Sequence, residues 1–153
     1  MTPIVRDALS SVGRVMRDAR QPWWIIGSGA VALLGADPGE VHDIDVLVDG
    51  VDADPLFTRL GLTPLTLTPD PLFRSEQFAK WHAGLLPVEF MVEFAVRSDA
   101  AWWPVMPRSR EMVRVEGEEL FVPARAELVA LLRRMGRSKD LIRAAILEGR
   151  EPG

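Results

Sequence analysis

Cysteine is absent from all 153 residues of this sequence. Its absence excludes disulfide bonds, zinc–thiolate sites and thiol nucleophiles, and it is consistent with a reducing compartment. Long hydrophobic runs are absent too, because the longest, residues 23–36, is interrupted by Ser28 and three glycines. A membrane-spanning helix needs roughly 20 apolar residues, so this run is expected to belong to the core.

The N-terminal segment also lacks the features of a targeting signal. Charged residues are scattered through residues 4–19, which therefore contain no continuous apolar stretch of the kind found in signal peptides. We expect a soluble, cytoplasmic protein with no membrane partner.

The residues that are present fit a globular domain. Hydrophobic residues make up 48% of the chain and charged residues 26%, a balance that favours a packed core over disorder. The length gives room for one domain and little more. We therefore predict a single domain over residues 1–153.

The charges are unevenly distributed along the chain. Segment 37–54 holds seven acidic residues and no Lys or Arg, whereas segment 125–150 holds seven basic residues and three acidic ones. These segments are either two solvated faces or a cation site and an anion site. The net charge of −4 argues against general affinity for nucleic acid, although the local distribution of charge matters more than its sum.

Hydrophobic periodicity and turn residues predict alternating helices and strands. Helices are expected at 4–20, 30–34, 55–60, 124–135 and 138–147, the last capped by Ser138. Strands are expected at 23–26, 43–49, 65–67, 76–81, 88–96, 112–115 and 120–122, with a tight turn at 27–29 and a hairpin turn at 116–118. This order predicts an α+β fold, with a mixed β-sheet flanked by helices and a helix pair at the C-terminal end.

Two aspartates in the predicted strand 43–49 form the first candidate site. Side chains two residues apart project from the same face of a strand, so Asp43 and Asp45 should point together while Ile44 faces the core. Adjacent carboxylates repel each other unless one is protonated or a cation lies between them. Mg²⁺ prefers oxygen ligands and is the natural occupant. Acids near the end of a strand also commonly face water without any ligand, and this segment alone leaves both interpretations open.

A glycine-rich turn forms the second candidate site. Gly27 and Ser28 follow the predicted strand 23–26 and precede a short helix. Glycine lets the backbone approach an anion closely, and the amides and the serine hydroxyl of such a turn can hold phosphate oxygens. The turn lacks the spacing of a dinucleotide-binding glycine motif and the lysine of a P-loop. Taken alone, a turn of this kind more often serves tight packing.

Together, the two segments resemble the signature of the nucleotidyltransferase superfamily. In that family a hydrophobic strand leads to Gly-Gly or Gly-Ser, a helix follows, and the next strand carries an acid–hydrophobic–acid pattern, as residues 23–35 and 42–48 do here. The resemblance is nearest to small bacterial nucleotidyltransferases of the abortive-infection toxin and antibiotic adenylyltransferase type. Residues 122–132, followed by 137–140, look like the family's closing helices, which often carry an Arg-x-Lys-Asp element, here at 137–140.

The resemblance implies a role for each matching residue. Asp43 and Asp45 would bind two Mg²⁺ ions. Gly27 and Ser28 would contact the β- and γ-phosphates of ATP or another nucleoside triphosphate. The family adds a third acid from a later strand, and Glu89 fits that place as a metal ligand and general base.

Two of these assignments have alternatives. Glu93 lies on the same predicted face as Glu89, and motif position alone favours Glu89. Four strand residues separate the two by about 13 Å, so at most one of them lies at the metal.

Arg137 and Lys139 would contact the nucleotide, although a solvated helix face explains these bases equally well. Relatives often have a lysine at the position of Leu132. Arg133, Arg137 or Lys139 would have to replace it here.

The implied activity is the Mg²⁺-dependent transfer of a nucleoside monophosphate, with AMP from ATP as the expected group, to a hydroxyl of an unidentified acceptor. The acceptor could be a small molecule such as an antibiotic, a tRNA or a protein, and a homodimer could complete its binding site. The alternative is a catalytically lapsed domain of the same type that binds a nucleotide or a protein. Glu89, where the family more often has Asp, and Leu132, in place of the lysine, favour this alternative.

Overall fold

A computed structural model describes residues 1–149. The remaining residues 150–153, which include Arg150 of the basic segment and the end of the predicted domain, lie outside the described part. The helices are α1 Pro3–Val15, α2 Gly27–Leu33, α3 Gly50–Leu60, α4 Arg125–Met135 and α5 Ser138–Leu147. The strands are β1 Trp24–Ile26, β2 Ile44–Leu47, β3 Phe73–Arg74, β4 Gln77–Trp81, β5 Val88–Val92, β6 Ala95–Ser98, β7 Ala101–Pro104, β8 Glu111–Val115 and β9 Glu118–Val122.

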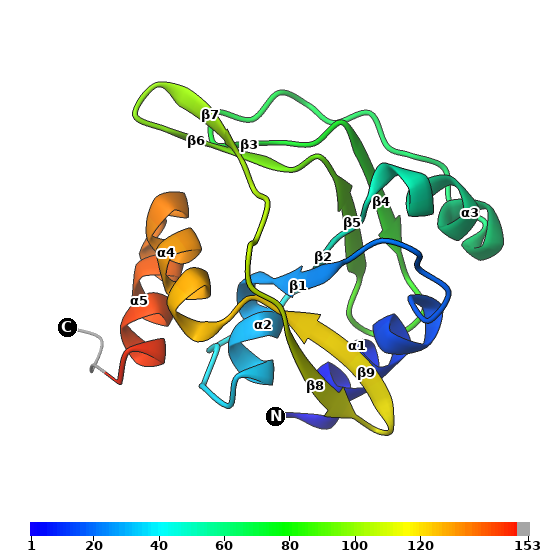
Figure 1. The fold of residues 1–153 in the computed structure, drawn as a ribbon, viewed down its shortest axis with the longest axis horizontal. Coiled ribbons are helices and arrows are strands. Elements are labelled where there is room, and N and C mark those ends of the chain that lie inside the picture. The colour runs from blue at the N-terminus through cyan, green and yellow to red at the C-terminus, as the bar shows by residue number, and fades with distance from the viewer. Residues whose placement is uncertain (150–153) are drawn as a thin grey trace.

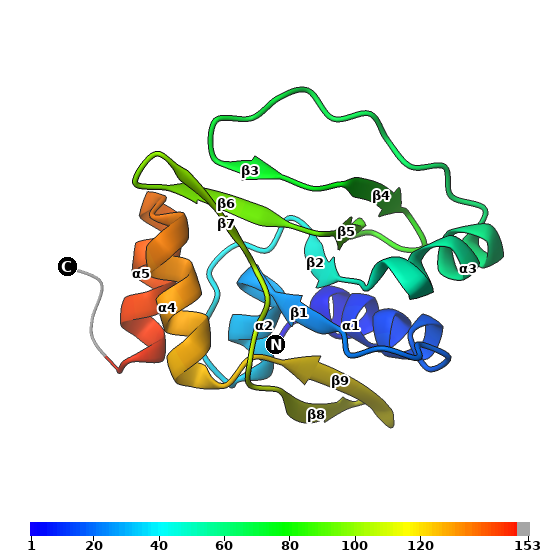
Figure 2. The same cartoon turned by 45° about the horizontal axis from the view of Figure 1, so that its top comes forward.

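The central element is a mixed sheet of four strands in the order β1-β2-β5-β4. β2 and β5 run parallel, and β1 and β4 pair with them in antiparallel orientation. One face packs against the helices through fully buried side chains such as Leu9, Ile44 and Phe90. The opposite face carries Leu47 and Met91 and packs toward β6 and the end of α4. Figure 2 shows α1 and α2 on the helix-covered side of β1 and β2, and β3 and β6 on the opposite side.

Two smaller sheets lie at opposite ends of the molecule. The first has the order β3-β6-β7 and lies beside α4 at the top of Figure 1. The second is the β8–β9 hairpin, which packs against α1 and β1 at the bottom. The predicted α+β class, the mixed sheet with flanking helices and the C-terminal helix pair are thus confirmed.

The predicted strand 88–96 is wrong as one element. Glu93 has φ of +50°, so the chain bends there and continues in a different sheet. β5 therefore ends at Val92, and β6 begins at Ala95. Hydrophobic alternation does not report such a bend, because the side chains on both sides of it remain buried.

The ends of several helices also differ from the predictions. The predicted turn 27–29 is the first turn of α2, and α1 ends at Val15 rather than near residue 20. α3 begins at Gly50, because the Asp49 carboxylate accepts a hydrogen bond from the backbone N–H of Val51 at 2.9 Å and caps the helix.

The predicted cap of α5 is wrong. The N-cap is Arg137 rather than Ser138, and the Asp140 carboxylate accepts from the Arg137 backbone N–H at 3.2 Å.

The predicted strand 65–67 has no regular structure, although Leu65 donates a backbone hydrogen bond to Phe78. β3 and β7 were not predicted, because β3 is only two residues long and β7 is the tryptophan pair followed by Pro104. Throughout residues 1–149 the helices fall short of the length and hydrophobicity needed to cross a bilayer.

Gly13 allows α1 to pack closely on β9. A Cβ atom at this position would lie 2.7 Å from the Cβ atom of Glu118 and 3.4 Å from the backbone oxygen of Glu119. Neither is the end of a flexible side chain, so a larger residue would push the helix away from the hairpin.

We predict that Gly13→Ala destabilises the protein by about 1–3 kcal/mol through overpacking, even though alanine by itself favours a helix by about 1 kcal/mol. Urea unfolding monitored by circular dichroism measures the change. Arg14→Ala, at the next and exposed position of α1, is the control and should change stability by less than about 0.5 kcal/mol. A Gly13→Ala variant as stable as the wild type would contradict the prediction.

Candidate functional site

Three acidic side chains meet at one edge of the central sheet. Asp45 is paired with Glu89 in the parallel register of β2 and β5, and Asp43 precedes β2 on the same face. Carboxylate oxygens of Asp43, Asp45 and Glu89 lie within 4.8 Å of one another. The neighbouring residues Ile44 and Phe90 are fully buried on the opposite face and so fix the direction of the acids. The structure thus brings together the three acids that the sequence suggested.

Glu93, the other candidate for the third acid, lies outside this cluster. It occupies the bend after β5, where a hydrogen bond with Glu76 and the charge of that group raise the pKa of its carboxyl. Its partner is therefore Glu76 rather than the aspartates, and the structure favours Glu89 as the third member.

The three carboxylates of this cluster repel one another. Burial raises the pKa of Asp45 well above its usual value, and the charges of Asp43 and Glu89 add to this effect. The Arg137 guanidinium opposes the shift, and the Lys80 ammonium lies 3.6 Å from a Glu89 oxygen. Three oxygen donors with an excess of negative charge are a ligand set suited to a divalent cation such as Mg²⁺.

The glycine turn lies directly against these acids. Ile26, the last residue of β1, is paired with Asp45, and Gly27 follows with φ of +65°. A Cβ atom at Gly27 would lie 3.1 Å from Asp45 Oδ2, so glycine is required both by the backbone conformation and by the approach to the carboxylate. The Ser28 hydroxyl donates to the backbone oxygen of Asp43 at 3.5 Å. Turn and acids therefore form one site.

The start of α5 supplies the basic side of the site. Arg137 and Lys139 line the same cavity as the acids, as the resemblance suggested. The Arg137 guanidinium is bound to the Asp140 carboxylate at 2.6 Å and 3.0 Å, so its charge is partly neutralised. Within residues 1–149, Lys139 has no ion-pair partner. Arg133 does not line the cavity and pairs with Glu148 instead.

Arg143 is a site residue that the sequence did not single out. Its guanidinium donates to the backbone oxygens of Pro38 and Glu40 at 2.9 Å and 3.1 Å, and burial lowers the pKa of this group. It therefore fixes the loop that leads into Asp43. No signal in the sequence links Arg143 to this loop, because the partners are backbone oxygens more than 100 residues away.

A cavity of about 500 Å³ opens in front of the acids. Arg74 and Trp102 of the small sheet also line it. The apolar lining consists of Ile26, Phe73, Phe78, Met91, Phe94 and Met135. The tertiary structure alone identifies these residues, since they come from four strands, the bend between β5 and β6, and one helix.

Comparisons with known proteins bear on the fold of the chain. No protein-family model matches the chain, and no curated protein sequence matches it. Among solved structures, a protein from Thermotoga maritima assigned as a nucleotidyltransferase superposes with a TM-score of 0.69 at 21% identity, covering 87% of this chain and 86% of that one. An antigenic nucleotidyltransferase-like protein from Paracoccidioides brasiliensis has a TM-score of 0.60 at 16% identity, covering 95% and 76%.

The antibiotic-resistance factor ANT(2″)-Ia, solved with adenylyl-2″-tobramycin, is a further structural match. It has a TM-score of 0.56 at 13% identity, covering 96% of this chain and 88% of that one. All of these identities are low, so the matches bear on the fold. They confirm the resemblance first suggested by the glycine turn and the aspartate pair: the chain has the nucleotidyltransferase fold.

Proposed function

We propose that this protein is a Mg²⁺-dependent nucleotidyltransferase that moves a nucleoside monophosphate, with AMP from ATP as the first candidate, to a hydroxyl of an acceptor. The observation that carries the proposal is the meeting of three carboxylates with the Gly27 turn in one cavity. The nucleotidyltransferase fold of the structural matches supports it.

Asp43, Asp45 and Glu89 would hold the metal, with two ions as in the resemblance. The chemistry supplied by bound Mg²⁺ is a lowered pKa of the acceptor hydroxyl and neutralisation of the charge on the departing pyrophosphate. Glu89 lies at the edge of the cluster nearest Lys80, and its carboxylate would accept the proton of the attacking hydroxyl.

The groups around the acids would hold the nucleotide. The lack of a side chain at Gly27 leaves room for phosphate oxygens beside Asp45, and the Ser28 hydroxyl would turn from the Asp43 backbone oxygen to donate to one of them. Lys139, whose ammonium has no ion-pair partner within residues 1–149, would contact the triphosphate together with Arg137. Arg143 would keep the loop before Asp43 in place.

A second candidate function is nucleotide binding without catalysis. The observation behind it is Leu132, which stands where relatives often have a lysine and is fully buried in the core. Lys139 and Arg137 already supply bases inside the cavity, and this favours the enzyme. Nucleotide binding that depends on Mg²⁺ but never releases pyrophosphate would favour the binding module.

The activity itself can be tested by pyrophosphate release from MgATP in the presence of RNA, protein and aminoglycoside acceptors. We predict that Asp43→Ala lowers the rate by at least about a hundredfold, because a ligand of the proposed metal is lost. Asp54→Ala is the control, since Asp54 belongs to the same acidic segment but is exposed on α3 outside the cavity, and it should keep full activity. Equal rates for the two variants would refute the proposed role of Asp43.

Metal binding can be tested without any acceptor. We predict that Asp45→Asn raises the melting temperature of the metal-free protein, because the variant removes a repulsive charge, and abolishes stabilisation by Mg²⁺. The wild type should gain about 2.7 kcal/mol when Mg²⁺ is at a hundred times its dissociation constant. Glu93→Gln removes the same charge outside the cluster and should retain the Mg²⁺ effect. Thermal unfolding with EDTA or MgCl₂ measures both quantities.

The effect of Asp45→Asn on the stability of the metal-free protein should depend on pH. The pKa of Asp45 is higher in the folded than in the unfolded state, so the folded protein takes up a proton first as pH falls. The charged Asp45 therefore lowers the free energy of unfolding at neutral pH. This loss disappears as pH falls through the raised pKa of Asp45. We predict that the stability advantage of metal-free Asp45→Asn over the wild type narrows from pH 8 toward pH 5. A constant difference in melting temperature across this range would contradict the prediction.

A further inference from the structure

A second cavity lies between the connection from α1 to β1 and the β8–β9 hairpin. Its volume is about 500 Å³, and it shares no lining residue with the cavity that holds the three carboxylates. Its charged lining residues are four arginines and two glutamates: Arg17, Arg20, Arg110, Arg114, Glu118 and Glu119. We call it the arginine cavity. Its lining has an excess of two positive charges, whereas acids outnumber Arg and Lys in the lining of the carboxylate cavity.

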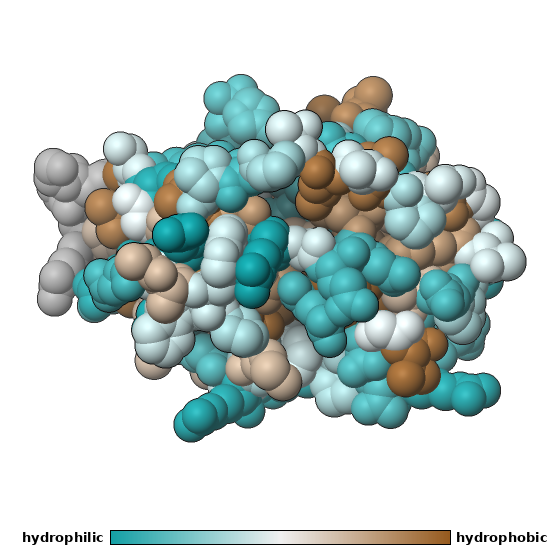
Figure 3. Space-filling view, turned by 90° about the horizontal axis from the view of Figure 1, so that it is seen from above, coloured by the Kyte–Doolittle hydropathy of each residue, from teal (hydrophilic) through white to brown (hydrophobic). Residues whose placement is uncertain are grey.

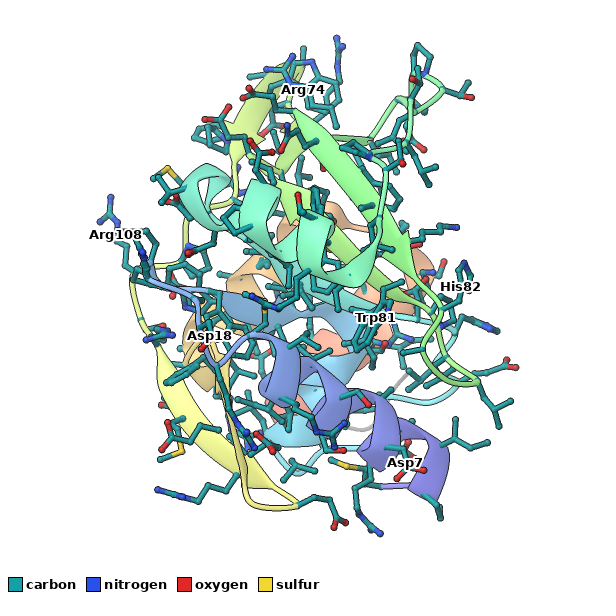
Figure 4. All side chains as sticks on the ribbon, turned by 90° about the vertical axis from the view of Figure 1, so that its right-hand side faces the viewer. Asp7, Asp18, Arg74, Trp81, His82 and Arg108 are labelled. Atoms are coloured by element: carbon teal, nitrogen blue, oxygen red, sulfur yellow. The ribbon has the colours of Figure 1, made fainter. Side chains whose placement is uncertain are left out.

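The arginine cavity belongs to the hairpin end of the molecule. Figure 3 looks onto the opposite end, which carries the small sheet and where hydrophilic and hydrophobic residues both reach the surface. Figure 4 shows Asp18 and Arg108 on the left of the view, where the hairpin also lies, and Arg74 of the small sheet at the top. Asp18 and Arg108 each precede an arginine of the cavity by two residues, so segments that are distant in the chain meet here.

The two glutamates of the arginine cavity already have partners. The Glu118 carboxylate, which is largely buried, accepts from Arg17 Nε at 2.9 Å and from a second nitrogen of the same guanidinium. The Glu119 carboxylate lies 3.4 Å from an Arg114 nitrogen. Within residues 1–149, Arg20 and Arg110 have no carboxylate within 4.0 Å. These two arginines therefore supply the excess positive charge.

Arg110 differs from an ordinary solvated arginine because the protein fixes its guanidinium. Its Nε donates to the backbone oxygen of Trp23 at 3.2 Å, and its guanidinium carbon lies 3.4 Å from the centroid of the Phe121 ring. Trp23 is buried and packs edge-on against Phe121, with ring centroids 5.4 Å apart. Partial burial lowers the pKa of Arg110. Exposed Arg14 also lacks an acidic partner in the described chain, but it makes none of these contacts.

The contacts of Arg110 leave the two Nη groups of its guanidinium without a protein acceptor in the described part of the chain. A guanidinium presents its N–H donors in a flat fork that matches two oxygens of a phosphate. Because the group is partly desolvated, its charge loses hydration that a bound anion would replace. The cavity thus contains a cation whose position is fixed before any ligand binds.

Arg20 lines the cavity on a backbone that is fixed separately. The backbone N–H groups of Arg20 and Gln21 donate to the two oxygens of buried Asp52, each at 2.9 Å. The exposed Arg20 side chain has no hydrogen-bond acceptor among residues 1–149, so the fold does not depend on it. Its charge is available to a ligand.

We propose that the arginine cavity binds a phosphate dianion, either inorganic phosphate or the phosphate group of a small monoester. Such a group carries a charge of about −1.5 to −2 at pH 7, which matches the excess positive charge of the lining. Its oxygens point in several directions and can accept from Arg110 and Arg20 together. The cavity is larger than a phosphate ion, so the body of a small ester fits beside Trp23 and Phe121. The site does not depend on the proposed nucleotidyl transfer.

Binding can be measured by isothermal titration calorimetry with inorganic phosphate and with glycerol 3-phosphate, in EDTA at fixed ionic strength. Arg20→Gln/Arg110→Gln should weaken binding on the order of tenfold or more, because two charged donors are lost. The matched control Arg14→Gln/Arg108→Gln removes the same charge from exposed positions outside both cavities and should bind as the wild type does. Lys139→Gln, in the carboxylate cavity, should also leave the affinity for phosphate unchanged.

Glu119→Gln should have the opposite effect. It removes a competing negative charge and frees Arg114, so we expect binding to strengthen by about threefold or more. Loss of structure cannot produce such a gain. Arg20→Gln alone should weaken binding with an unchanged melting temperature in the absence of phosphate, so the test remains decisive if Arg110→Gln unfolds the protein.

The two ligands separate the two sources of the phosphate group. Tighter binding of inorganic phosphate identifies the free ion as the ligand, and tighter binding of glycerol 3-phosphate identifies an ester, and either result supports the site. Succinate carries the same charge on two separated planar groups and should bind more weakly. No measurable binding by the wild type, equal affinities of the arginine variant and its control, a loss confined to Lys139→Gln, or succinate bound as tightly as phosphate would overturn the proposal.

Discussion

The pairing of β2 with β5 holds three carboxylates against one another, and the rest of the site depends on this constraint. Asp45 and Glu89 face each other in the parallel register, while Ile44 and Phe90 beside them are fully buried on the other face. A slip of one residue would bury the acids and expose the hydrophobic side chains. Burial of the core therefore fixes an arrangement that electrostatics alone would oppose.

The repulsion among the three carboxylates explains several features of the residues around them. Burial and two neighbouring charges raise the pKa of Asp45, and a divalent cation is the species that best relieves such a cluster. The glycine at position 27 keeps the turn close to Asp45 without filling the space in front of it. Arg143 holds the preceding loop by hydrogen bonds to the backbone oxygens of Pro38 and Glu40, and its charge also interacts with Asp43 and Asp45. In the proposed function, a bound divalent cation would offset the repulsion among the three carboxylates.

The cavity lining brings together charged and aromatic groups from different parts of the chain. Near the acids, Lys139 and Arg137 supply positive charge from the start of α5. Arg74 and Trp102 of the small sheet also line the cavity, with the Arg74 guanidinium over the Trp102 ring. These parts come from segments that are distant in the chain, and the bend at Glu93 is what turns the chain out of β5 and into the small sheet.

The sequence by itself determined the features that depend on local pattern. Strand alternation placed Asp43 and Asp45 on one face. The glycines at 27–29 predicted the turn next to them. Motif position favoured Glu89, but only the register of β2 and β5 separated it from Glu93. The tertiary structure alone decided the bend at Glu93, because a single positive φ angle leaves no trace in hydrophobic periodicity. It also decided the role of Arg143, since contacts to distant backbone oxygens exist only once the chain is folded.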